Sequence, residues 1–290
     1  MPEPNLFHVD VFATAPLTGN GLAVFLNTEQ WSTSAMQRLT QEMRQFESIF
    51  LSAIGPAGAI ARVFTVEEEL PFAGHPILGA AAVLHRTQAA ADESRSWELQ
   101  LPYGKVDVRT HKAGASHRCA MNQGRAVMGS TVSLAALRPI LSRLGLQDVD
   151  VVAGIDAQVI STGLPYLIVP VSGQALAKAT IVAMDLEVRL QAFGAKFILL
   201  LAVEARELRT WDNLGRVEDV ATGSAAGPAA AYLWNLALAA PTDSIEFAQG
   251  RFAGRPSKIT VARDAQQQLL VSGEVWPVSH GFLDVTEGLA

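Results

Sequence analysis

The 290-residue chain contains one cysteine, Cys119, and only 17% of its residues are charged. A single cysteine excludes an intramolecular disulfide bond and a zinc site built on several thiolates, and it fits a reducing compartment. The formal net charge of −6 includes no basic excess, and the arginines and lysines are scattered along the chain. We therefore expect no nucleic-acid partner, because such proteins carry a basic patch or stripe.

Long apolar runs are also missing. The longest aliphatic run, Phe197–Val203, is far shorter than the roughly 20 residues that a membrane helix needs, and it reads as a buried strand. The segment Met1–Asp10 has no basic stretch followed by an apolar core, so no signal peptide is predicted. These absences predict a cytoplasmic protein without a membrane partner.

Cofactor signatures are absent as well. No G-x-G-x-x-G follows a predicted strand, and no glycine-rich loop ends in Lys-Ser or Lys-Thr. Five histidines lack the spacing of metal ligands, and we expect them on the surface or in loops. They are His8, His85, His111, His117 and His280. We expect neither an organic cofactor nor a metal ion.

The composition does supply material for a core, since 49% of the residues are hydrophobic. Alternation and turn residues predict strands at 6–12, 22–26, 48–52, 61–65, 92–109, 159–171, 197–203 and 244–284. Helical periodicity predicts helices that begin at Ser32 or Ser34 and end near Arg44, and at 77–87, 134–144, 186–193 and 228–239. A polar, glycine-containing region at 113–133 is the candidate crossover between two domains.

An internal echo supports the division into two domains. Gly74–Leu84 reads GHPILGAAAVL and Gly223–Leu233 reads GSAAGPAAAYL, an offset of 223 − 74 = 149 that also places Glu69 on Glu218. Each copy has an acidic segment, a glycine turn and a helix of small residues. A helix start carries unpaired N–H groups and the positive end of the macrodipole, and glycine allows close approach of a ligand. Gly74 and Gly223 are therefore candidate anion-binding positions, although both could simply begin buried helices.

Five segments of this chain resemble the signature blocks of the PhzF-like phenazine-biosynthesis family. They occur in the family's order from about Asn5 to Glu287 and read VFATAPLTGNGLAVF (11–25), ELPFAGHPILGAA (69–81), STGLPYLIVPV (161–171), EDVATGSAAGPAAAYL (218–233) and GRPSKITV (254–261).

The resemblance implies a diaminopimelate epimerase-like α+β fold. Its two pseudo-symmetric domains would each wrap a curved, mostly antiparallel sheet or barrel around a central helix, with the active site between them. We expect one domain at 1–115, joined by 279–290, and the other at 116–278. The resemblance also implies a homodimer and a cofactor-independent isomerase whose type reaction is isomerisation of trans-2,3-dihydro-3-hydroxyanthranilate.

The resemblance assigns the catalytic roles to Glu47, His75 and Asp219. Glu47 would be the acid/base, because a proton shift beside a carboxylate needs a group that removes and returns a proton. A free glutamate has a pKa of roughly 4.3, and apolar neighbours such as Phe46 and Phe50 would raise it toward the working pH. His75 would donate a hydrogen bond or relay a proton. Asp219 would hold a substrate amino or hydroxyl group or orient His75.

The expected substrate-binding residues are Asn20, Gly74, Gly223 and Ser224. Two of them could instead have purely structural roles: Asn20 could only form its Asn-Gly turn, and Ser224 could only cap its helix.

Other functions remain open at this stage. The chain could be an epimerase or a dehydratase of a hydroxylated amino acid on the same fold, or a binding protein that has lost catalysis. A racemase with two catalytic thiols is excluded, because His75 and Ser224 occupy the positions where such enzymes place cysteines. Cys119 lies in neither loop and is expected to be a structural thiol.

Overall fold

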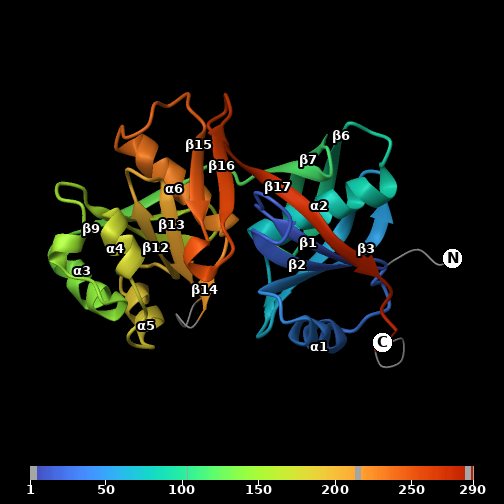
Figure 1. Cartoon of the computed structure of the whole chain (residues 1–290), viewed down its shortest axis with the longest axis horizontal. Coiled ribbons are helices and arrows are strands. Elements are labelled where there is room, and N and C mark those ends of the chain that lie inside the picture. The colour runs from blue at the N-terminus through green and yellow to red at the C-terminus, as the bar shows by residue number, and fades with distance from the viewer. Residues whose placement is uncertain (1–4, 103, 213–216, 285–288, 290) are drawn as a thin grey trace. The chain divides into compact units, whose positions relative to one another are not determined.

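The computed structural model describes residues 5–102, 104–212, 217–284 and 289, and it divides into two units (Figure 1). Unit 1 comprises Met1–Asn122 with Ser272–Ala290, and unit 2 comprises Gln123–Val271. Each unit has its own set of paired strands and its own central helix, so the α+β architecture follows the expectation.

The unit boundaries lie seven residues away from the expected ones, at 122/123 and 271/272 in place of 115/116 and 278/279. Strand pairing explains the difference. Strand β8 (Ser116–Asn122) pairs with β7 (Gly104–Ala113), and β17 (Leu269–Gly281) pairs with β1 (Leu6–Val11) from Val275 onward. The region 113–133 therefore holds β8 and β9 and is more than a crossover.

The sheet of unit 1 closes into a barrel. Its strands pair in the order β1–β2 antiparallel, β2–β3 parallel, β3–β4 antiparallel, β4–β6 parallel, β6–β7 antiparallel and β7–β8 antiparallel. Strand β17 pairs with both β8 and β1 and completes the ring. The strands not yet bounded are β2 (Asn20–Phe25), β3 (Glu47–Gly55), β4 (Gly58–Thr65) and β6 (Ser94–Leu101).

Helix α2 (Gly74–Gln88) lies inside this barrel, in contact with β1, β2, β3, β6, β7 and β8 (Figure 1). Small residues make this possible, because strands can approach the helix axis closely only where side chains are short. Gly79 shows how close the approach is: a Cβ atom there would lie 2.3 Å from Cδ2 of Leu22. The helix is buried along most of its length, as an apolar helix without a polar face must be.

The outer face of the unit 1 sheet is covered by α1 (Thr33–Met43). Ser32 is its N-cap and accepts a hydrogen bond from the Ala35 N–H, which confirms one of the two predicted caps. The helix packs on a cluster that includes Phe25 and Phe50, whose rings stack with centroids 4.7 Å apart.

Unit 2 repeats this plan. Its pairings run β10–β11 antiparallel, β11–β12 parallel, β12–β13 antiparallel, β13–β15 parallel and β15–β16 antiparallel, which is the sequence of pairings from β1 to β7 in unit 1. The strands are β9 (Val127–Val132), β10 (Ala157–Ser161), β11 (Pro165–Val171), β12 (Phe197–Ala202), β13 (Glu207–Trp211), β15 (Ile245–Gln249) and β16 (Ser257–Arg263). The internal echo is therefore a structural repeat.

The central helix of unit 2 is α6 (Gly223–Asn235), which contacts β10, β11 and β16 (Figure 1). The outer layer of unit 2 is a set of short helices on the face of β11 and β12 that is turned away from α6. These helices are α3 (Leu134–Leu141), α4 (Gly173–Lys178) and α5 (Leu186–Gln191). Unit 2 also contains single 3₁₀ turns at η1 (Ser142–Leu144), η2 (Asp148–Asp150) and η3 (Arg251–Ala253).

A two-residue strand precedes each central helix. Strand β5 (Glu69–Leu70) pairs with β4, and β14 (Glu218–Asp219) pairs with β13. Arg62 holds Glu69 with two hydrogen bonds of 2.7 and 2.6 Å, and Arg209 holds Glu218 with two of 2.9 and 2.6 Å. These bidentate pairs fix the chain just before each helix start, because the guanidinium fork matches a carboxylate.

Both central helices begin at the glycine, so the expectation that Gly74 and Gly223 stand at helix starts is confirmed. The helix predicted at 77–87 begins at 74, and the helix predicted at 228–239 begins at 223 and ends at 235. Among the described residues, none of the helices has the length and apolar character required to span a membrane.

Candidate active site

Three of the predicted residues meet at one end of the unit 1 barrel. Asn20 is the first residue of β2, Glu47 is the first residue of β3, and His75 is the second residue of α2. Parallel pairing of β2 with β3 brings their starting ends to the same edge. All three side chains are buried, with exposed fractions of 3%, 7% and 4%.

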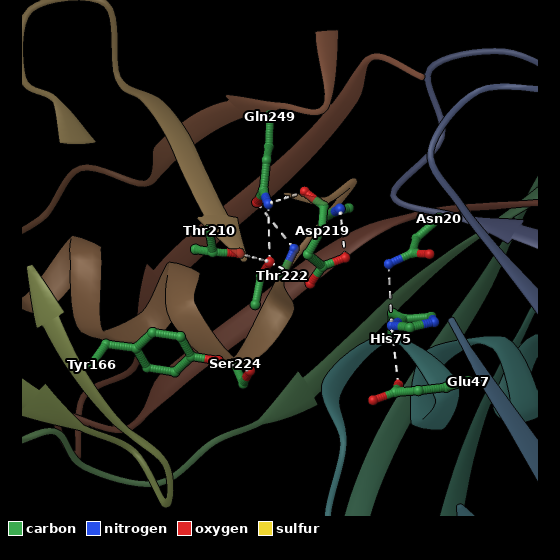
Figure 2. A network of polar contacts seen from close by, with 10 residues as sticks. Asn20, Glu47, His75, Tyr166, Thr210, Asp219, Thr222, Ser224 and Gln249 are labelled. Atoms are coloured by element: carbon green, nitrogen blue, oxygen red, sulfur yellow. Dashed lines mark hydrogen bonds and ion pairs between the residues drawn. The ribbon is translucent and has the colours of Figure 1, made fainter. Parts of the chain in front are cut away.

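His75 lies between the other two (Figure 2). Its Nδ1 atom is 3.4 Å from Oε2 of Glu47 and 3.5 Å from Nδ2 of Asn20. Burial lowers the pKa of His75 to about 3, because removal from water penalises the charged imidazolium. The imidazole is therefore neutral near pH 7, and its contact with Glu47 is a polar contact rather than an ion pair.

The second ring nitrogen of His75, Nε2, is buried and has no hydrogen-bond partner among the described residues. A buried polar atom without a partner costs about 1–3 kcal/mol, and such atoms concentrate at functional sites. Nδ1 faces both the Asn20 amide and the Glu47 carboxylate, so the tautomer of the neutral ring decides which of the two it bonds. In the tautomer in which Nδ1 accepts from Asn20, Nε2 carries the proton and is a hydrogen-bond donor.

The backbone at the start of α2 is a further source of donors. Its N-cap is Ala73, which supplies no side-chain hydrogen bond, and Gly74 is buried. The first N–H groups of a helix have no intrahelical partner, and the macrodipole favours negative charge beside them. This end of unit 1 therefore combines a carboxylate, a neutral imidazole and a helix N-terminus, which suits proton transfer beside an anion.

In unit 2, Asp219 is the last residue of β14, shortly before α6 begins at Gly223, and it is 8% exposed. Its carboxylate accepts a hydrogen bond from the Thr222 hydroxyl and another, of 3.3 Å, from the Ala221 N–H. These local donors hold the carboxylate in one orientation. The N-cap of α6 is Thr222, but its side chain does not cap the helix, because it is bonded to Asp219.

Two residues missed by the sequence reasoning complete this network: Gln249 and Thr210 (Figure 2). The Gln249 amide donates to the Thr222 hydroxyl at 2.9 Å and to the Asp219 carbonyl at 2.9 Å, and its oxygen accepts from the Thr222 N–H at 3.0 Å. The hydroxyls of Thr210 and Thr222 are 2.7 Å apart. Nothing in the sequence around Gln249 signals this role, since it acts across 27 residues.

Ser224 and Gly223 form the other part of the unit 2 loop. The Ser224 hydroxyl is 2.7 Å from the Tyr166 hydroxyl of β11, and the Gly223 carbonyl accepts a hydrogen bond of 2.8 Å from Gln123. Tyr166 lies in the segment 161–171, which resembles a family block, yet only the fold brings it to Ser224. The structure thus groups Asn20, Glu47, Gly74 and His75 in unit 1 and Asp219, Gly223 and Ser224 in unit 2. A shared site for both groups stays a prediction.

Cys119 lies apart from both groups and is fully buried in β8, where burial raises the pKa of its thiol. This environment suits the structural role expected for it. Across the part of the chain that the structure describes, no three histidine, cysteine, aspartate or glutamate side chains gather as metal ligands.

The chain matches known proteins over nearly its whole length. The PhzC-PhzF family model, described as phenazine biosynthesis-like protein, matches residues 9–281. A trans-2,3-dihydro-3-hydroxyanthranilate isomerase of Pseudomonas chlororaphis is 31% identical over 92% of this chain and 93% of its own length. An uncharacterized isomerase of Salmonella typhimurium is 28% identical over 98% and 99%. A solved structure of Pseudomonas aeruginosa, described as a predicted epimerase, is 46% identical with a TM-score of 0.92, over 98% and 100%.

Proposed function

This chain belongs to the PhzC-PhzF family of phenazine biosynthesis-like proteins, and we propose that it is an isomerase that moves a proton on a small carboxylate substrate with Glu47 as acid and base. The substrate class we propose is that of trans-2,3-dihydro-3-hydroxyanthranilate, on which its 31%-identical relatives act. The observation that carries the proposal is the buried Glu47 carboxylate 3.4 Å from a neutral His75.

In the proposed reaction, the Glu47 carboxylate removes a proton from one carbon of the substrate and returns it to another. Negative charge develops on the substrate between these steps and needs a donor that does not itself lose a proton. In the tautomer with its proton on Nε2, the neutral imidazole of His75 meets that need through its Nε2–H, and its low pKa keeps it neutral throughout. No step requires a cofactor, because the carboxylate carries the proton.

Unit 2 would bind the polar groups of the substrate. We assign the oriented carboxylate of Asp219 to a substrate amino or hydroxyl group, because its position is held by Thr222 and Ala221. The Ser224 hydroxyl and the N–H groups at the start of α6 are suited to the substrate carboxylate.

The test is proton exchange followed by NMR in deuterated water. The chain would be incubated with trans-2,3-dihydro-3-hydroxyanthranilate and a panel of small amino and hydroxy acids. We expect deuterium to enter one of them and Glu47→Gln to slow this exchange at least about 100-fold, the range of general acid–base catalysis. The control is Glu42→Gln, which removes an exposed carboxylate of α1 in the same unit.

Exchange that persists in Glu47→Gln would exclude Glu47 as the acid and base. Absence of exchange with every compound, in the unmodified chain as well, would instead reject the proposed substrate class. A substrate deuterated at the reacting carbon gives a further check in ordinary water: a single carboxylate returns part of the label to the product.

Epimerisation is the second candidate, because the 46%-identical structure is described as a predicted epimerase. Inversion at one carbon needs proton transfer on both faces and therefore a second acid or base. In the unit 2 loop, the group available for that role is Asp219. Chiral analysis of the product from the same incubation separates the two reactions: an epimerase forms the opposite stereoisomer, whereas an isomerase forms a compound with a moved double bond.

A further inference from the structure

An open pocket of about 270 Å³ lies in unit 2, away from Asp219 and Ser224. Its walls come from the end of α6, the end of β16, the turn that joins β16 to β17, the start of β17, and the segment before β9 with the start of β9. They include Arg125, Met128, Trp234, Arg263, Gln267 and Leu269. The volume is just below the range of about 300–1,000 Å³ typical of drug-sized ligands, so it suits a smaller molecule.

For two guanidinium groups in this pocket, the hydrogen-bond partners found among the described residues are neutral. Arg125 donates from Nε and Nη2 to the Gln266 carbonyl at 3.1 and 2.9 Å, and Arg263 donates from Nη1 to the Gln267 side-chain oxygen at 2.9 Å. Within the described residues, no carboxylate lies at ion-pair distance from either group. Asp264, next in sequence to Arg263, accepts from backbone N–H groups instead. The pocket therefore presents two uncompensated positive charges.

Two buried donors of residues that line the same pocket also lack hydrogen-bond partners in the part of the chain that the structure describes: Nε of Arg263 and the indole Nε1 of Trp234. The Arg263 guanidinium stacks over the Trp234 ring at 4.1 Å, a cation–π contact that holds both side chains in place. Burial without a counter-charge also lowers the pKa of Arg263, although an arginine stays protonated at neutral pH. The polar side of the pocket thus offers N–H donors and positive charge.

Met128, Leu269 and the Trp234 ring also line the pocket and give it an apolar wall. We propose that this pocket binds a small organic acid, whose carboxylate is held by Arg125 and Arg263 and whose apolar body packs on Trp234. Guanidinium groups bind carboxylates through paired, charge-assisted hydrogen bonds. This site is separate from the proposed catalytic residues and does not depend on their function.

The test is a titration with sodium benzoate. Binding is monitored by NMR through the side-chain indole N–H signals of ¹⁵N-labelled protein. The chain has five tryptophans, so the Trp234 signal is assigned by its loss in Trp234→Phe. We expect this signal to shift saturably with benzoate, and Arg263→Gln and Arg125→Gln each to weaken binding at least about tenfold. Arg138→Gln is the matched control, because it removes an arginine of the same unit that already pairs with Asp148.

Glu47→Gln should leave the titration unchanged, which separates this pocket from the proposed catalytic residues. The proposal is overturned if millimolar benzoate does not move the Trp234 signal, or if both arginine variants bind as tightly as the unmodified chain. Inorganic phosphate is the second probe. Tighter binding of phosphate than of benzoate would reject an organic acid as the ligand, since phosphate cannot use the apolar wall.

Discussion

His75 shows how strongly burial acts on a single side chain. At the sequence level it is a histidine in a Gly-His-Pro loop with an ordinary pKa near 6.5. In the fold it is 4% exposed, lies 3.4 Å from Glu47 and has a pKa lowered to about 3. The change converts a residue that would titrate near neutrality into a permanently neutral donor, which is what stabilisation of a developing negative charge requires.

This shift predicts a pH dependence of stability. Between pH 6.5 and about 3, the unfolded chain binds a proton at His75 and the folded chain does not, so the free energy of unfolding falls as the pH falls. The slope from this residue is about 1.4 kcal/mol per pH unit. From pH 7 to pH 5, we expect the unmodified chain to lose about 2 kcal/mol more stability than His75→Gln. Urea denaturation at both pH values measures the difference, and parallel losses in the two proteins would contradict the buried neutral imidazole.

At the scale of elements, the two central helices determine where the functional groups lie. Helices α2 and α6 each begin at a glycine, follow a two-residue strand held by an arginine–glutamate pair, and carry small residues toward the surrounding strands. Small residues are required on α2 and α6 because the surrounding strands pack close to each helix axis. Gly227 repeats the pattern of Gly79, because a Cβ atom there would lie 2.4 Å from the side-chain oxygen of Gln123.

Gly79→Val tests this packing. The new side chain would overlap Leu22 and press on Val9 and Val11 of the adjacent strands, so we expect a loss of about 1–3 kcal/mol in the free energy of unfolding. Gly173→Val is the matched control, because a Cβ atom at Gly173 meets nothing within 4 Å. Gly173→Val should change the free energy of unfolding by no more than about 1 kcal/mol, the scale of the helix-propensity difference between glycine and valine. Equal stability of the two variants, measured by urea denaturation, would mean that α2 does not lie tightly against β1 and β2.

At the scale of the whole molecule, one strand joins parts of the chain that are far apart in sequence. Strand β17 begins in unit 2 and continues into unit 1, where it pairs with β1 from Val275 to Gly281 and with β8. It is the strand that closes the unit 1 barrel. Without it, β1 and β8 would become open edges with unpaired backbone groups.

A chain that ends at Val271 should therefore lose the order of unit 1 and keep that of unit 2. Hydrogen exchange detected by mass spectrometry measures this, with peptides from α2 and α6 as the two reporters. We expect the α2 peptides of the shortened chain to exchange at least about 100-fold faster than those of the full chain, and the α6 peptides to keep most of their protection. Retained protection in α2 would mean that the barrel is stable without β17.

Much of this architecture could be read from local patterns. The glycine-started helices, the Ser32 cap and the buried strand at β12 depend on turn chemistry, capping and short-range periodicity, which act within a few residues. The internal repeat was visible in the sequence because both copies need small residues where strands pack against a central helix. Strand β8 was missed, since it lies in a polar region where only pairing with β7 and β17 makes it a strand.

The sequence by itself thus determined the family, the α+β class and the candidates Glu47, His75 and Asp219, because these depend on which residues stand at which positions. Only the tertiary structure decided how those residues are arranged: the neutral state of His75, the support of Asp219 by Gln249 and Thr210, and the cationic pocket around Trp234. Each of these depends on burial and on contacts between residues far apart in the chain. Solvation and long-range packing are properties of the folded molecule, and no local pattern encodes them.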